Sequence, residues 1–232
     1  KGKHSGVVLF SLFSRGVATA RDAWCYNSSY QTLTNDMRAM IGVYNAERER
    51  FRAKYSTRNP TEHLGTVSDF VDKDPRKISW NRSLLQDFSK DKQALFKSDH
   101  IVKSVYRPFF CQWMYFDRQM NDMIYQVPRL FPDVKAENFL IVTSGTGGRS
   151  AFTCIMVNQI PCLHMADIDG SQCFPRYIYQ ENKPSSEYPD LLNNAQQACQ
   201  TRHDAITDAG LKHFQDAYPG QTISKEDLFY YV

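Results

Sequence analysis

Arginine, glutamine and asparagine side chains alternate with aromatic ones between Tyr106 and Pro132. Eight of these 27 residues are aromatic, whereas aromatic residues make up 13% of the whole chain. The interleaved polar residues are Arg107, Gln112, Arg118, Gln119, Asn121, Gln126 and Arg129. Their donors and acceptors match guanine and adenine edges in the DNA major groove, and Arg also binds phosphate. The pattern therefore indicates nucleic-acid contact. Composition alone favours the alternative, a hairpin whose aromatics fill the core and whose polar residues face water.

A glycine-rich run, Ser144-Gly145-Thr146-Gly147-Gly148, follows a strand-like segment and invites comparison with a phosphate-binding loop. Such a loop needs a Lys and a Ser or Thr after its last glycine, or a helix whose N-terminus receives the phosphate. Arg149 and Ser150 follow here, and the next segment has the composition of a strand. We therefore interpret the run as a turn.

His164, Asp167 and Asp169 lie within six residues of one another, with Cys162 and Cys173 nearby, and could in principle hold a metal ion. Zinc ligands usually come in more closely spaced pairs, and the segment has the composition of a turn. The chain has no G-x-S-x-G motif, no local Cys–His signature and no paired carboxylates typical of acid–base catalysis. We assign no catalytic residue, metal or cofactor to this chain, and an independent metal-dependent hydrolase is the least favoured hypothesis.

Positive charge is concentrated near the N-terminus. Residues 1–60 hold ten Lys and Arg against four Asp and Glu, or +6, and residues 61–232 hold 18 against 21, or −3, which sum to the net +3. This asymmetry favours a polyanionic partner, with a solvated basic helix as the alternative. The six cysteines form no CxxC pair and no signal peptide precedes them, which indicates a reduced, cytoplasmic protein. No apolar run approaches the roughly 18–20 residues that span a bilayer, so we expect no membrane partner.

Helices are expected in the first hundred residues. Apolar residues recur at steps of three, four or seven between residues 29 and 58, with Arg48 and Arg52 on one flank, and Asn59-Pro60 ends this helix. Further helices are expected at about 61–72 and 83–97, with a short extended piece from Lys77 to Trp80 between them.

Beyond residue 105 the sequence is typical of short strands separated by turn residues, which predicts a four- or five-stranded, mostly antiparallel sheet. The expected strands are Phe109–Asp117, Met123–Leu130, Asn138–Ser144, Ala151–Val157 and Cys173–Gln180. A loop is expected over 181–194, and a helix at about 204–217 is broken by Pro219-Gly220. Ser224 and Asp227 then resemble a capping box that begins a last helix. Helices, then strands, then helices predict the α+β class, with a central sheet.

Seven short groups of residues, in order along the chain, carry a family signal. They are Thr19 with Arg21-Asp22-Ala23-Trp24 and Tyr26-Asn27; Ile78 and Trp80; Tyr106-Arg107-Pro108-Phe109 with Gln112-Trp113 and Tyr115-Phe116-Asp117; Gln126 with Pro128-Arg129; Pro161 with Leu163-His164; Cys173-Phe174-Pro175; and Asp227 through Tyr231. Together they resemble the C-terminal specificity region of type ISP restriction–modification enzymes. The resemblance covers roughly Arg15 to Val232, and seven groups in register are fairly specific.

The resemblance implies that the chain is the target recognition domain of a longer enzyme with a nuclease, a DEAD/DEAH-type ATPase motor, a coupling region and an adenine methyltransferase. Residues 1–20 would be the junction from the methyltransferase, and residues 21–232 the recognition domain. Its helical part would span about 28–100, its sheet-rich part about 105–180 and its helical tail about 190–232. The methyltransferase's Asn-Pro-Pro-Tyr and glycine-rich motifs are absent from this sequence. S-adenosylmethionine, ATP and Mg²⁺ would therefore serve other domains of the parent enzyme.

The implied partner is double-stranded DNA, from which the domain would present a target adenine for extrusion into the methyltransferase and direct ATP-dependent restriction. The candidate DNA-binding residues are Arg21, Arg48, Arg52, Arg107, Gln112, Arg118, Gln119, Asn121, Gln126, Arg129 and Gln172. The alternative is a non-catalytic docking module that packs against the methyltransferase and motor domains. The chain begins without Met and stops soon after its last capping box, so we expect further residues on both sides.

Overall fold

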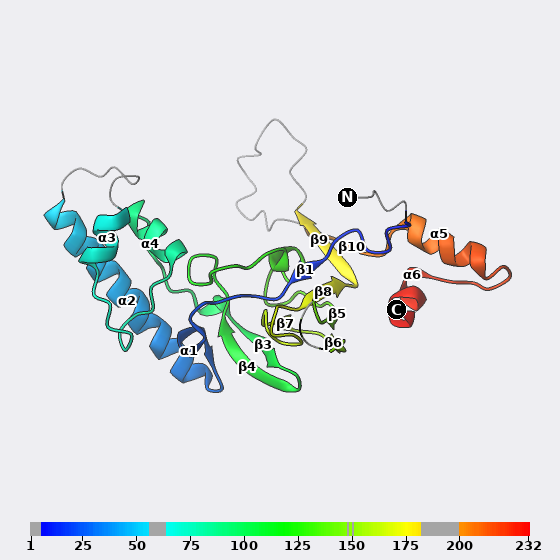
Figure 1. Ribbon diagram of the computed structural model, residues 1–232, viewed down its shortest axis with the longest axis horizontal. Coiled ribbons are helices and arrows are strands. Elements are labelled where there is room, and N and C mark those ends of the chain that lie inside the picture. The colour runs from blue at the N-terminus through cyan, green and yellow to red at the C-terminus, as the bar shows by residue number, and fades with distance from the viewer. Residues whose placement is uncertain (1–5, 56–63, 148, 150, 182–199) are drawn as a thin grey trace, which may run out of the picture. The chain divides into compact units, whose positions relative to one another are not determined.

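Two units interleave along the sequence. The computed structural model describes residues 6–55, 64–147, 149, 151–181 and 200–232 (Figure 1). The hairpin unit comprises Gly16–Ile124 and Ile160–Met165, and the terminal unit comprises the described residues of Lys1–Arg15, Tyr125–Gln159 and Ala166–Val232. Helices and mostly antiparallel strands occur in both, which confirms the predicted α+β class. None of the helices in the described ranges is both long and apolar enough to cross a membrane.

The hairpin unit combines helices with a four-stranded sheet of order β2-β4-β3-β7. Its helical elements are α1 (Asp22–Cys25), α2 (Tyr30–Lys54), α3 (Leu64–Phe70), α4 (Arg82–Ser89) and the 3-10 turn η1 (Ser98–His100). Its strands are β2 (Tyr26–Asn27), β3 (Ile101–Arg107), β4 (Phe110–Tyr115) and β7 (Ile160–Pro161). Strands β2, β4 and β3 pair antiparallel, and β7 runs parallel to β3. The β3–β4 hairpin therefore forms the middle of this sheet.

Helix α2 forms where the sequence predicts its longest helix. The Ser29 hydroxyl caps it by accepting a hydrogen bond from the Thr32 N–H. On its buried stripe, Phe51 packs against Phe70 of α3 and Phe88 of α4, with ring centroids 5.1 and 5.6 Å apart, and both helices lie beside α2 (Figure 1). This packing stabilises α2, since isolated helices are marginal in water. The helix ends at Lys54, with Tyr55 in an extended conformation, which is earlier than the end expected at residues 58–60; those residues lie outside the described ranges.

The terminal unit contains a four-stranded sheet of order β1-β8-β5-β6 and a two-stranded sheet of β9 and β10. Its strands are β1 (Ser14–Arg15), β5 (Leu140–Thr143), β6 (Cys154–Val157), β8 (Gln172–Pro175), β9 (Tyr177–Glu181) and β10 (Gln200–Asp204). Its helical elements are η2 (Val127–Arg129), α5 (Asp208–Ala217) and α6 (Lys225–Tyr231). Every strand pair in this unit is antiparallel.

Helix α6 packs on the apolar core of the terminal unit. Leu228 and Phe229 are buried against Ile141 of β5 and Ile206. The predicted capping box is confirmed, because the Ser224 hydroxyl accepts the Asp227 N–H while the Asp227 carboxylate accepts the Ser224 N–H. The cap fixes where the helix begins, and the two buried side chains fix the face that it turns to the sheet.

The strands are divided differently from the sequence expectation, which placed them in one central sheet. Each unit has its own four-stranded sheet in the described part of the chain. Alternation of apolar and polar residues predicts that a segment is a strand, but it does not predict which strand is its partner. Strand β3 begins at Ile101, before the expected sheet-rich part, and Cys173–Gln180 divides into β8 and β9.

Three expected elements differ. The strand predicted at Met123–Leu130 is wrong, because Tyr125 has a positive φ of 47° and Pro128, which has no N–H for a ladder, lies within the turn η2. The helix predicted to reach residue 97 ends at Ser89. The helical tail predicted from about residue 190 instead contains strand β10 before α5. The loop expected at 181–194 lies, apart from the backbone of Glu181, outside the described residues.

Candidate nucleic-acid interface

The β3–β4 hairpin carries two cations that lie over aromatic rings. The Lys103 Nζ lies 3.9 Å from the centroid of the Trp113 ring, and the Arg107 guanidinium carbon lies 4.0 Å from that of Tyr106. Arg107 also donates from Nη1 to the Tyr106 carbonyl oxygen at 2.7 Å. A ring face positions a cation without neutralising its charge. The hairpin therefore holds two preorganised positive charges that suit phosphate oxygens.

Gln112 lies on β4 with a half-buried side chain. Its Nε2 donates to the Ser28 hydroxyl at 3.4 Å, which is long for a hydrogen bond. The amide can therefore exchange this weak contact for a base edge at little cost.

The turn after β4 presents Arg118 to solvent. The Asp117 carboxylate accepts the backbone N–H groups of Gln119 and Met120 and lies 3.0 Å from the His100 Nδ1. Burial raises the pKa of Asp117, but the hydrogen bonds from His100 and the two backbone N–H groups outweigh it and leave the pKa below its ordinary value. Arg118 itself is exposed at the apex of this braced turn.

Asn121 and Gln119, in the same turn, have internal partners. Asn121 is 1% exposed, its Oδ1 accepts the Asp117 N–H at 2.9 Å, and its Nδ2 donates to the Tyr115 carbonyl at 3.1 Å. Gln119 is half-buried and donates from Nε2 to the Tyr44 hydroxyl at 3.3 Å. Asn121 thus braces the turn, and Gln119 joins it to α2.

Arg21 is 4% exposed and lies inside the hairpin unit. Its Nε donates to the Ser79 carbonyl at 3.1 Å, its Nη2 to the Asn81 Oδ1 at 2.6 Å, and its Nη1 to the Met120 carbonyl. Burial lowers its pKa, and the nearby Asp122 carboxylate opposes that effect. The side chain joins three segments of the unit and does not face solvent.

The basic flank of α2 is largely compensated by carboxylates. Arg48 is 9% exposed, with Nη1 2.6 Å from the Glu49 Oε1 and Nε 2.8 Å from the Asp91 Oδ1. Arg52 is exposed and lies 3.6 Å from Glu49 and 3.8 Å from Asp91. Neighbouring acids therefore offset much of the positive charge expected from the sequence, which leaves Arg52 as the accessible member of the pair.

The remaining predicted residues belong to the terminal unit, so the Tyr106–Pro132 stretch is divided between the two units after Ile124. Gln126 and Arg129 are exposed around η2. Gln172 is half-buried on β8, where it pairs with Arg15 of β1. Arg15, an exposed side chain that the sequence prediction omitted, adds a positive charge beside Gln172.

A polar hollow in the terminal unit was not predicted from the sequence. It has a volume of about 420 Å³ and includes Asn158, Arg176, Tyr177 and Arg202 in its lining. The Arg202 guanidinium carbon lies 4.2 Å from the Tyr177 ring centroid, and that of Arg176 lies 4.8 Å from it. Arg176 also pairs with Glu226 at 2.6 Å. Arg202 comes from β10, in a region expected to be helical, so no sequence pattern indicated this arrangement.

The described part of the glycine-rich run, residues 144–147, lies in a turn between antiparallel strands, as predicted. Strands β5 and β6 pair on its two sides, and the Asp167 carboxylate accepts the N–H groups of Gly145 and Asp169 at 2.8 and 3.1 Å. Arg149 lies 2.7 Å from Asp169. These contacts give the acidic turn a structural role. In the described ranges, which omit residues 148 and 150, no group of three or more His, Cys, Asp and Glu side chains could hold a metal ion.

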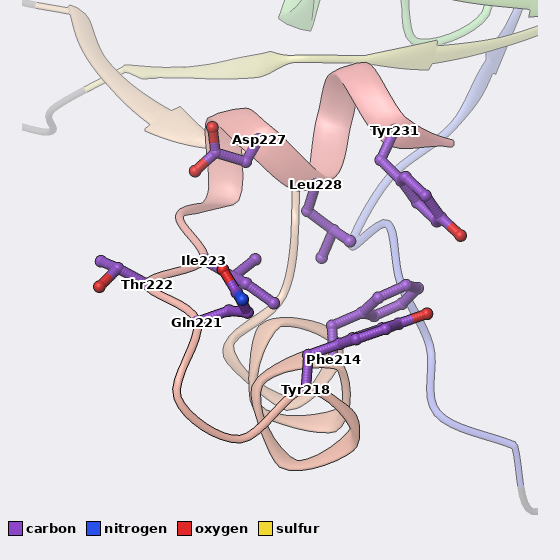
Figure 2. A pocket seen from close by; sticks show the side chains of 8 residues that line it. All are labelled: Phe214, Tyr218, Gln221, Thr222, Ile223, Asp227, Leu228 and Tyr231. Atoms are coloured by element: carbon purple, nitrogen blue, oxygen red, sulfur yellow. The ribbon is translucent and has the colours of Figure 1, made fainter.

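A second hollow, of about 280 Å³, lies between α5 and α6 (Figure 2). Phe214, Tyr218, Leu228 and Tyr231 surround it with apolar surface. Figure 2 shows the Asp227 carboxylate turned away from these rings. It accepts the N–H and the hydroxyl of Ser224 in the helix cap. Among the described residues that line it, the hollow therefore has no acid–base pair.

Comparisons with known proteins identify the family of the chain. The sequence-family model for the type ISP C-terminal specificity domain matches residues 8–232 of this chain. In solved structures, the chain is 30% identical to part of DrdV in a DNA complex, with a TM-score of 0.77 over 99% of this chain. It is 27% identical to part of a nuclease-deletion mutant of the type ISP restriction–modification enzyme LlaGI in complex with a DNA substrate mimic, with a TM-score of 0.74 over 94% of this chain.

The third similar structure is the ATP-dependent type ISP restriction–modification enzyme LlaBIII bound to DNA. Its identity to this chain is 25%, with a TM-score of 0.73 over 99% of this chain. The chain spans only 20%, 18% and 13% of the DrdV, LlaGI and LlaBIII chains, respectively. A search of curated proteins finds no match.

Proposed function

Because the chain belongs to the type ISP C-terminal specificity domain family, we propose that it recognises a specific sequence in double-stranded DNA. One observation carries the proposal. The chain matches three proteins solved as DNA complexes, with 25–30% identity over at least 94% of its length. The exposed Arg and Gln side chains supply the chemistry that such recognition requires.

The side chains divide into base-reading and phosphate-binding candidates. Gln112, Gln126 and Gln172 present amides that suit adenine edges, and Arg118 and Arg129 present exposed guanidinium groups that suit guanine. Lys103, Arg107, Arg15, Arg52 and Arg202 are the phosphate-binding candidates. Gln119 remains a candidate because its contact to Tyr44 is long at 3.3 Å. We leave Arg21, Arg48 and Asn121 out of the proposed contacts, because their polar atoms are buried with internal partners.

The proposal extends to a longer protein. In it, this domain would present a target adenine for extrusion into an adjacent methyltransferase and direct an ATP-dependent restriction activity. S-adenosylmethionine, ATP and Mg²⁺ would be bound by the methyltransferase, motor and nuclease domains, since this sequence lacks the motifs for them. Those domains would also be the intramolecular partners of this chain.

The test has two parts. Modification-sensitive sequencing of DNA from cells that express the full-length protein should show methylated adenines in one sequence context. Selection of bound DNA from a randomised duplex pool, at two salt concentrations, should enrich the same sequence, and affinity should fall with salt because phosphate binding releases counterions. Absence of enrichment and of salt dependence would refute the proposal.

Two variants then separate base reading from phosphate binding. Arg118→Ala should relax the preference at one position and cost roughly 1–3 kcal/mol against the preferred base if Arg118 contacts guanine. Lys103→Ala should weaken binding to all sequences and reduce the salt slope by about 1. Arg82→Ala is the matched control, because Arg82 is an exposed arginine on α4 of the same unit and is not a candidate.

The docking-module alternative makes a different prediction. The apolar hollow between α5 and α6, with half-exposed Tyr218 and exposed Tyr231, is the feature that favours it. Exchange of residues 100–180 with those of a relative of different specificity would distinguish the two functions. A changed methylation sequence would support DNA reading, whereas an unchanged one would support docking.

A further inference from the structure

The tip of the β3–β4 hairpin holds an aromatic side chain away from the protein. Arg107 pairs with Phe110, so Pro108 and Phe109 are the two residues of the turn. Phe109 has a φ of 61° and its residue surface is 93% exposed, more than any other large apolar residue in the described part of the chain. No core packing requires a phenyl ring at this point.

The backbone at Phe109 makes this placement unusual. A positive φ at the second central residue of a turn is the conformation in which Gly or Asn is ordinarily found, and a bulky residue there is an outlier. Outliers of this kind persist where the surrounding structure enforces them, and they cluster at functional sites. The exposed ring thus occupies a position where glycine would fold with less strain.

The tip is supported by further aromatic rings within the hairpin unit. Phe110 is half-exposed, with its ring centroid 6.5 Å from that of Tyr106 in an edge-to-face arrangement. Tyr106 in turn lies 4.7 Å from the buried Tyr26. The three rings pack in a row from β2 to Phe110, the residue that follows Phe109, and the tip is a two-residue turn closed by the Arg107–Phe110 pair.

The charges around the tip favour a polyanion over an apolar protein surface. Between Ile101 and Tyr115 the chain has two cations, Lys103 and Arg107, and no carboxylate. The carboxylate of Asp22 does face this hairpin, but the hydroxyl groups of Tyr106 and Thr19 donate hydrogen bonds to it. Arg107 lies next to the tip, and Lys103 lies farther along β3, opposite Trp113. An exposed aromatic ring with one fixed cation beside it and a second along the same hairpin suits a nucleic-acid base and its phosphate backbone.

We propose that Phe109 is a DNA wedge, which stacks on a base exposed by local unstacking of the bound duplex, while Arg107 holds a phosphate beside that base and Lys103 holds a phosphate farther along the backbone. Apolar side chains that enter base steps unstack them and bend the duplex. The inference rests on the proposed function. It adds a residue, Phe109, that deforms DNA, whereas the other candidates bind base edges or phosphates. Base unstacking beside the target also reduces the cost of extruding a nucleotide.

The test uses the full-length protein that contains residues 1–232 and duplexes of its selected sequence with 2-aminopurine at successive positions. Binding of the wild-type protein should raise the fluorescence of 2-aminopurine at one step. Phe109→Ala and Phe109→Gly should abolish this rise and weaken affinity by about 5- to 150-fold, the range expected for loss of one stacked base. Phe109→Trp should retain both effects.

Two controls keep the outcomes distinct. Phe152→Ala removes another exposed phenylalanine, 79% exposed beside the turn between β5 and β6, and should change neither fluorescence nor affinity. Phe109→Gly should also raise the melting temperature of the free protein, because it relieves the positive φ. Unchanged fluorescence and affinity in the Ala and Gly variants would refute the wedge proposal and favour a protein partner for the tip. That result would not affect the proposal that the domain recognises a DNA sequence. A wild-type protein that binds no duplex would overturn both proposals.

Discussion

Replacement of Arg21 by Met should lower the stability of the hairpin unit without a direct effect on DNA contacts. The sequence analysis placed Arg21 among the DNA-binding candidates, whereas the structure buries it. Its guanidinium donates to the carbonyls of Ser79 and Met120 and to the Asn81 side chain. Asn81 in turn caps α4 by accepting the Leu84 N–H at 2.9 Å. Met retains the length of the side chain but donates no hydrogen bond.

The magnitude follows from the groups left without a donor. Each hydrogen bond to a charged group contributes about 1.5–3 kcal/mol, and removal of one partner of a buried charged network costs about 3–5 kcal/mol. The hairpin unit has 109 residues in Gly16–Ile124 and six in Ile160–Met165, or 115 in total. For this size 1 kcal/mol corresponds to roughly 3–4 °C. We expect Arg21→Met to lower the melting temperature by roughly 10–20 °C.

The assay is calorimetric or spectroscopic melting beside DNA affinity measured well below the transition. Arg21→Lys should recover little of the loss, because one ammonium cannot reproduce the planar three-way fork. Arg82→Met, at an exposed arginine of the same unit, should change the melting temperature by less than about 2 °C. A variant Arg21→Met that melts normally but loses DNA affinity would refute the structural role and restore Arg21 as a DNA contact.

Three further predictions follow from local contacts. Asp117→Asn should destabilise the hairpin unit at pH values above the ordinary carboxyl pKa and have less effect in acid, because the lowered pKa of Asp117 in the folded state contributes stability that is lost as pH falls through that pKa. Melting temperatures of the two proteins measured over a range of pH test this expectation. A difference in melting temperature that stays constant at all pH values would contradict it. Ser224→Ala should cost about 1 kcal/mol by removing the α6 cap, measured by denaturant titration, with the exposed Thr222→Ala as a near-neutral control. In a Cys199→Ser background, a thiol reagent at pH 8 should modify exposed Cys111 and Cys154 quickly, while Cys25 and Cys173 stay unmodified until unfolding, because burial raises the pKa of each to about 12.

The sequence predicts the local elements better than their assembly. Helix α2, the cap of α6 and strands β4, β5 and β6 follow from periodicity and capping residues, which act over a few positions. Strand β7 pairs in parallel with β3 from more than 50 residues away, and no local pattern specifies that partner. For the same reason, no local pattern indicated that the stretch after Ile124 belongs to the other unit. Local rules failed at Met123–Leu130 because aromatic and branched residues there are interrupted by Pro128 and a positive φ at Tyr125.

Sequence prediction of the candidate site has a related limit. It concerns which acceptors the donors of a side chain meet, and not the periodicity of the chain. Arg21 and Arg118 are the same residue type, and both lie near or within family motifs, yet the first donates to three internal acceptors and the second faces solvent. The donor set that reads guanine is also the donor set that joins three loops, so residue type cannot separate the two roles. The structure separates them by where the acceptors lie. Specificity in this domain should therefore vary at residues such as Arg118, Gln126 and Arg129, whose replacement leaves no buried acceptor behind. Arg21 and Asn121 should tolerate little change whatever sequence is recognised.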